Sequence, residues 1–116
     1  MIGIRGVGAD RVLRARIRGR LDRTLRRLGV APVEAQVVFL DDNGPKGGPA
    51  QRCALTVRLP YRPLVRVEHT ATTSRSAFDG AFAALEPQLE RYRERQRESR
   101  RYPKKYYAAK RLLAGE

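Results

Sequence analysis

The 116-residue sequence contains one cysteine, Cys53, one histidine, His69, and no tryptophan. A single cysteine excludes an internal disulfide, and one histidine beside it leaves too few ligands for a zinc site. No apolar run approaches the roughly 18 residues that a membrane-spanning helix needs. The first residues also lack the basic-then-apolar layout of a secretion signal. We therefore expect a cytoplasmic protein with no metal and no membrane partner.

Acidic residues are scarce. The chain has 12 Asp and Glu against 25 Lys and Arg, so its formal net charge is +13 and its isoelectric point is about 11.2. Such a charge favours a polyanionic partner: nucleic acid first, an anionic membrane surface second and an acidic protein third. A charge that serves only solubility is the remaining alternative.

The motifs of common enzymes are missing. The stretch GVGAD at 6–10 is too short for a dinucleotide fingerprint. NGPKGG at 43–48 precedes a strand pattern, whereas a P-loop precedes a helix. No set of serine, histidine and aspartate, or of cysteine and histidine, falls where the strand order would bring it together. We expect no catalytic site, no cofactor and no small-molecule substrate.

Hydrophobic periodicity predicts six elements. Alternation predicts strands near residues 2–4, 33–40, 51–59 and 64–72, and a 3.6-residue period predicts helices over 11–28 and from 74 onward. The last three strands should form an antiparallel meander, with a hairpin loop at 41–50. Burying one apolar stripe of each helix gives an α+β two-layer sandwich, β-α-β-β-β-α, with both helices on one face of a four-stranded sheet. Residues 1–100 should form this domain and residues 101–116 a basic C-terminal tail.

Four single residues add detail to this prediction. Asp10 stands where the first helix needs an N-cap. Gly19 costs that helix about 1 kcal/mol relative to alanine, which predicts close packing at this point. His69 falls on the apolar face of its strand and is expected to be a core residue. Pro87 predicts a kink near 83–87, or two helices joined there.

The helix predicted over 11–28 carries eight arginines and a single acid. Four of them are spaced at i, i+4, i+7 and i+11 and form a row of about 16 Å beside the leucine stripe; this arginine row consists of Arg16, Arg20, Arg23 and Arg27. Arginine pairs bidentately with phosphate and stacks on bases. The row therefore predicts contacts with a nucleic-acid backbone, because a merely solvated face usually carries acids as well.

The last part of the chain is also basic. Residues 91–111 include ten lysines or arginines and only two glutamates. Three tyrosines are interleaved with lysines there: Tyr102, Tyr106 and Tyr107 among Lys104, Lys105 and Lys110. Aromatic residues among cations are typical of proteins that bind single-stranded nucleic acid. We expect Lys104 and Lys105 to bind RNA, in a tail that becomes ordered on binding.

Three stretches carry a resemblance to a known family. They are DDNGPKGGPAQRCALTVRLPYRPLVRVEHTAT at 41–72, AFDGAFAALEPQLERY at 77–92 and IRG at 4–6. Over about residues 1–95 the sequence resembles the ribosome hibernation-promoting factor family, also called protein Y or ribosome-associated inhibitor. The resemblance implies a layout similar to double-stranded RNA-binding domains. It also implies a non-catalytic bacterial protein that binds the small ribosomal subunit where mRNA and tRNA would sit, blocks initiation and protects idle ribosomes.

The resemblance assigns roles to individual residues. Basic residues of both helices face rRNA in the family, which implies rRNA contact for the arginine row and for Arg91, Arg93 and Arg97. The sequence departs from the family at Thr73 and Arg75, where an acidic residue and a tyrosine are usual. It also lacks the C-terminal dimerisation domain of the long members, so ribosome pairing through that domain is not expected.

Other functions stay open at this point. The family has been labelled a sigma-factor modulator, so the chain could instead be a protein-interaction module. It could also bind RNA or DNA without the ribosome. A helix lying on a membrane is the weakest alternative, because the apolar face of 11–28 has no tryptophan or phenylalanine. A weak homodimer is left open too.

Overall fold

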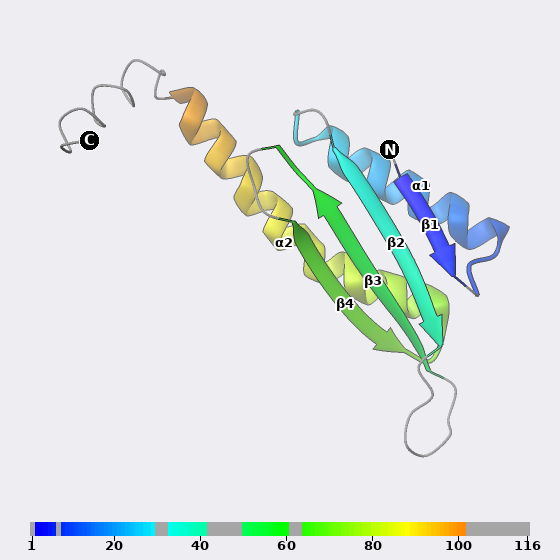
Figure 1. The fold of residues 1–116 in the computed structure, drawn as a ribbon. Coiled ribbons are helices and arrows are strands. Elements are labelled where there is room, and N and C mark those ends of the chain that lie inside the picture. The colour runs from blue at the N-terminus through cyan, green and yellow to red at the C-terminus, as the bar shows by residue number, and fades with distance from the viewer. Residues whose placement is uncertain (1, 7, 30–32, 42–49, 61–63, 102–116) are drawn as a thin grey trace.

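The computed structural model describes residues 2–6, 8–29, 33–41, 50–60 and 64–101. Its elements are β1 (Ile2–Gly6), α1 (Arg11–Arg26), β2 (Glu34–Asp41), β3 (Gln51–Arg58), β4 (Val65–Ala71) and α2 (Ser74–Arg101). Figure 1 shows both helices on the same side of the sheet, so the α+β sandwich is confirmed. Most of the predicted hairpin loop and the tail residues 102–116, with Lys104 and Lys105, lie outside the described residues. The division of the chain near residue 100 stays a prediction.

The sheet has the strand order β1-β2-β3-β4. β1 runs parallel to β2, with Ile4 beside Val37. The other strands are antiparallel neighbours, and Val37, Leu55 and Val67 stand in register across them. The predicted meander is confirmed. Since side chains alternate between the two faces of a strand, these residues all reach the face that the helices cover.

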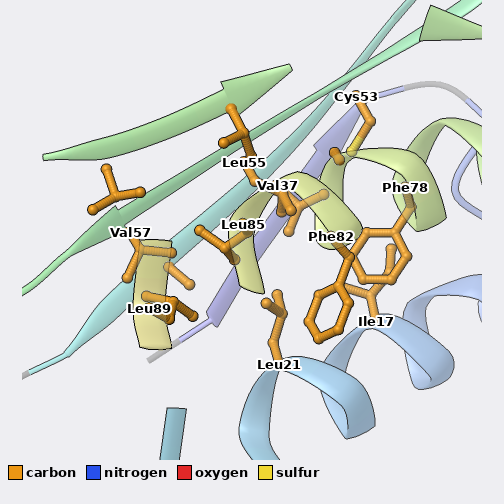
Figure 2. Close-up of a cluster of buried hydrophobic side chains, with 14 of the residues drawn as sticks. Ile17, Leu21, Val37, Cys53, Leu55, Val57, Phe78, Phe82, Leu85 and Leu89 are labelled. Carbon is orange, nitrogen blue, oxygen red and sulfur yellow. The ribbon is translucent and has the colours of Figure 1, made fainter. Parts of the chain in front are cut away.

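The core lies between that sheet face and one stripe of each helix. Side chains from both helices meet the strand residues there, each 4% exposed or less (Figure 2): Ile17, Leu21, Val37, Cys53, Leu55, Val57, Phe78, Phe82, Leu85 and Leu89. Burial raises the pKa of the Cys53 thiol to about 12, so this cysteine is protonated and unreactive in the folded protein. Its place in the fold is that of a small apolar residue.

α1 begins at the predicted cap and ends two residues earlier than predicted. The backbone N–H of Leu13 donates to the Asp10 carboxylate at 2.8 Å, which satisfies a free donor of the first turn. Beyond the last helical residue, Gly29 has φ +64°, a left-handed conformation that favours glycine. A methyl group at Gly19 would meet no neighbouring atom within 4 Å. The prediction of close packing at Gly19 is therefore wrong.

α2 is one helix that continues through Pro87, so the alternative of two separate helices is wrong. Beyond the proline, the Tyr92 hydroxyl donates to the carbonyl of Pro60 at 3.1 Å and ties the helix to the end of β3. His69 is exposed, and its ring lies beside the backbone of α2 at Gly80. The prediction of a core histidine is therefore wrong. Neither of the two described helices is long and apolar enough to cross a membrane.

Candidate nucleic-acid interface

The arginine row lies on the side of α1 that faces α2. Arg16 and Arg20 each contact the same oxygen of Asp79 on α2, both at 3.2 Å. Arg75, one helical turn before Asp79, approaches its other carboxylate oxygen at 4.0 Å. Half of the row therefore has an acidic partner on the second helix, and these ion pairs hold the two helices side by side.

The other half of the row is more open. Arg23 and Arg27 are exposed, and the Arg23 side chain donates to the carbonyl of Gly19 at 3.2 Å. Arg20 is partly sheltered, with its guanidinium carbon 4.9 Å from the centre of the Phe82 ring. A cation over an aromatic face is held there by the charge distribution of the ring. The row therefore passes from a fixed end at Arg16 to a solvated end at Arg27.

The row borders a groove between the two helices. Its two adjoining parts are lined by Arg20, Arg23, Thr24, Arg27, Phe82 and Glu86, and by Thr24, Arg27, Leu28, Ala83, Glu86, Pro87, Leu89, Glu90 and Arg93. We call this surface the interhelical groove. Four arginines and two glutamates line it, so cations outnumber anions there.

The predicted arginines of α2 do not all reach this groove. Arg93 lines it and forms an ion pair with Glu90 at 3.8 Å. Arg97 is exposed and lies one turn further on the same side of the helix. Arg91 is also exposed, but two residues from Arg93 correspond to about 200° around a helix. Arg91 therefore points away from the groove.

Two further arginines of α1 have structural partners on β1 and on the segment that follows it. Arg14 donates to the carbonyl of Ala9 at 2.8 Å and to that of Ile4 at 3.4 Å. Arg18 donates to the carbonyl of Ile2 at 3.1 Å. β1 is an edge strand, and an edge strand has backbone carbonyls without a partner strand. These two arginines cover that edge.

The chemistry that this arrangement supports is the binding of anions. Guanidinium groups from both helices line one groove, and an arginine side chain stays charged at any physiological pH. In the part of the chain that the structure describes, no group of three histidine, cysteine or acidic side chains could hold a metal ion.

Comparisons with known proteins agree with this fold. The model of the family described as Sigma 54 modulation protein / S30EA ribosomal protein matches residues 2–97. The crystal structure of the Thermus thermophilus Protein Y N-terminal domain is 27% identical with a TM-score of 0.60, covering 78% of this chain and 93% of that one. A ribosomal subunit interface protein from Coxiella burnetii is similar in fold, with 17% identity, a TM-score of 0.53, and 81% and 96% of the two chains covered. A search of curated protein sequences finds no match. The chain belongs to the Sigma 54 modulation protein / S30EA ribosomal protein family, which is the hibernation-promoting factor family that its sequence resembles.

Proposed function

We propose that this protein binds rRNA of the small ribosomal subunit in the region of mRNA and tRNA, and so inhibits translation and promotes ribosome hibernation. The observation that carries the proposal is the interhelical groove, where arginines of both helices gather on a chain of this family. The two similar structures, a Protein Y domain and a ribosomal subunit interface protein, agree with this function. Such a protein acts in the bacterial cytoplasm without catalysis, cofactor or small-molecule substrate.

The groove suits a phosphate backbone. The arginine row extends over about 16 Å and can contact several phosphates, each through the paired donors of a guanidinium group. Arg93 and Arg97 extend the cationic surface along α2. We place Arg91 at its periphery, because it lies on another side of the helix, and we propose that Lys104 and Lys105 add contacts beyond the end of α2.

A charge-matched pair of double variants tests the interface. R23A/R27A removes two exposed arginines of the row, and R11A/R26A removes two exposed arginines on other sides of α1. The first variant should bind purified small subunits more weakly, with a salt dependence reduced by about 0.7 per lost phosphate contact. The second should bind almost as the unchanged protein does. Equal losses in both variants would show that net charge, not the groove, determines binding.

Cosedimentation tests the partner itself. The protein should travel with small subunits through a low-salt gradient of lysate from stationary-phase cells. A protein that stays at the top of that gradient would contradict the proposal. Equal affinity for random-sequence RNA duplex and for small subunits would favour general RNA binding instead.

One further function is favoured by a specific observation. The description of the matching family also names sigma 54 modulation, and a basic groove attracts an acidic protein as well as a phosphate chain. A protein complex that survives nuclease treatment of the lysate would support this alternative. Loss of all bound material after nuclease treatment would support the RNA proposal.

A further inference from the structure

Asp79 is an acidic residue at the centre of a cationic surface. Its carboxylate contacts Arg16 and Arg20 across the helix pair at 3.2 Å each, and Arg75 on its own helix at 4.0 Å. None of these side chains is buried: Asp79 is 37% exposed, Arg16 32%, Arg20 36% and Arg75 68%. The cluster therefore faces solvent with three positive charges and one negative charge.

The carboxylate leaves most of the arginine donors available. A guanidinium group has five N–H donors. Arg16 uses the Nε and Nη2 groups toward Asp79, and Arg20 uses Nη1. The Phe82 ring lies 4.9 Å from the Arg20 guanidinium and fixes it from a second side. Arg16 and Arg20 are thus held in place, while part of each guanidinium group still faces solvent.

Holding the arginines in place solves a physical difficulty. Three guanidinium groups that converge on one spot repel each other, and each long side chain loses conformational entropy when a ligand fixes it. A carboxylate between them offsets the repulsion and fixes two of the side chains before a ligand arrives. A tetrahedral phosphate can then accept hydrogen bonds from more than one guanidinium group. Paired N–H donors of this kind are how arginine binds phosphate best.

The surroundings of the cluster also favour an anion. A hollow beside it is lined by Arg16 of α1 and by Thr73, Ser74 and Arg75 at the N-terminus of α2. Backbone N–H groups at a helix N-terminus attract negative charge. Here the N–H of Ser76 donates to the hydroxyl of Thr73 at 3.1 Å, so the hollow offers an anion the earlier N–H groups of this turn and the helix dipole. Asp10 also lines the hollow, but its carboxylate accepts the backbone N–H of Leu13 as the cap of α1.

We propose that Asp79 is a positioning residue that holds Arg16 and Arg20 in place, and that these two arginines and the neighbouring Arg75 form one preorganised binding site for a backbone phosphate of RNA. The inference rests on the proposed function, since it takes RNA as the ligand. It adds Arg75 to the interface and gives an acidic residue a favourable effect on RNA binding. A carboxylate that only competed with phosphate would have the opposite effect.

The sign of one substitution separates these two effects. Asp79→Asn keeps the size of the side chain, removes the carboxylate and raises the net charge by one. If Asp79 positions the arginines, the variant binds RNA about tenfold more weakly in spite of its added charge. The matched control is Asp22→Asn, which adds the same charge on another side of α1, where Asp22 pairs with Arg26 at 3.1 Å. That control should bind as tightly as the unchanged protein or slightly more tightly.

The assay measures dissociation constants at several salt concentrations for purified small subunits and for a labelled single-stranded RNA, with a thermal unfolding curve for each variant. Asp79→Glu keeps the carboxylate and should restore part of the affinity lost in Asp79→Asn. Arg75 offers a test that does not depend on stability, because its side chain is 68% exposed. Arg75→Gln should unfold at an unchanged temperature and bind RNA about threefold more weakly. The control Arg26→Gln should bind RNA as tightly as the unchanged protein.

Each outcome decides one question. If the unchanged protein binds RNA and Asp79→Asn binds as tightly or more tightly, the positioning role is overturned and the proposed function stands. If Asp79→Asn is too unstable to assay, unchanged binding of Arg75→Gln overturns the inference by itself. If the unchanged protein binds neither small subunits nor RNA, the proposed function fails and the inference fails with it.

Discussion

Two glycine-to-alanine substitutions should change the stability of this fold in opposite directions. Gly19 lies in the middle of α1, and an added methyl group there would meet no neighbouring atom within 4 Å. Glycine inside a helix is about 0.5–1 kcal/mol less favourable than alanine. With no clash to offset that gain, Gly19→Ala should raise the free energy of unfolding by about this amount.

Gly6, at the end of β1, is the opposite case. Its φ is +110°, and a methyl group there would lie 2.9 Å from both the N and the C atom of Phe39 and against its carbonyl oxygen. These are backbone atoms of β2, and Gly6 stands beside Phe39 in the parallel pairing. They cannot move aside without disturbing the β1–β2 ladder. Backbone strain of this kind costs about 1–3 kcal/mol, so Gly6→Ala should lower the free energy of unfolding by at least about 2 kcal/mol.

Urea unfolding followed by circular dichroism measures both effects. The transition midpoint should rise for Gly19→Ala and fall for Gly6→Ala, with similar slopes because the surface exposed on unfolding is nearly the same. RNA affinity should not change in Gly19→Ala, since Gly19 does not line the interhelical groove. A lower midpoint for Gly19→Ala, or an unchanged one for Gly6→Ala, would refute this reasoning about the two sites.

Three further measurements address the core, the buried thiol and the charge of the groove. Leu21→Ala should lower the free energy of unfolding by about 2.7–5 kcal/mol, because Leu21 is 0% exposed in the core; a loss below 1 kcal/mol would contradict that packing. Cys53 should not react with a thiol reagent at pH 8 until the protein is unfolded, because its pKa is about 12 and the reactive thiolate is absent at that pH. Fast labelling of the native protein would contradict its burial. A chain that ends at residue 101 should bind single-stranded RNA with a salt slope of about 5, which corresponds to the arginine row, Arg75, Arg93 and Arg97 at about 0.7 per contact. A slope twice as large would show that cations outside the groove also bind RNA.

The order of the elements could be predicted because the two periods are clear in this sequence. Val37 and Phe39 alternate with less buried neighbours on β2, and both are 2% exposed or less. The stripe of α1 that includes Ile17 and Leu21 is buried as its spacing predicts. Of the two alternatives for Pro87, separate helices are wrong. The core position predicted for His69 is also wrong, because the place of its ring depends on a tertiary contact. α2 continues through its proline, and the backbone of α2 at Gly80 makes room for the histidine ring.

The sequence predicts the arginines of the candidate site but not their acidic partner on the second helix. The spacing of Arg16, Arg20, Arg23 and Arg27 places them on one side of α1, as the structure has them. No periodicity reveals which side of the second helix will lie beside them, so the pairing with Asp79 carried no signal of its own. The paired residues are 59 and 63 positions apart in the chain, so the pairing depends on how the two helices pack on one sheet.

The arginines of α1 therefore serve two physical needs that composition cannot separate. Arg14 and Arg18 supply donors to backbone carbonyls of an edge strand, whose groups otherwise invite another chain. Their charge adds to the long-range attraction of a polyanion, but their donors are engaged away from the groove. Arg23 and Arg27 have the reverse balance, because they are exposed beside a second cationic helix. The candidate interface is defined by the places where guanidinium donors remain open to solvent. Removing Arg14 or Arg18, which contact the edge strand, should therefore mainly lower the stability of the fold. Removing Arg23 or Arg27 should mainly weaken RNA binding.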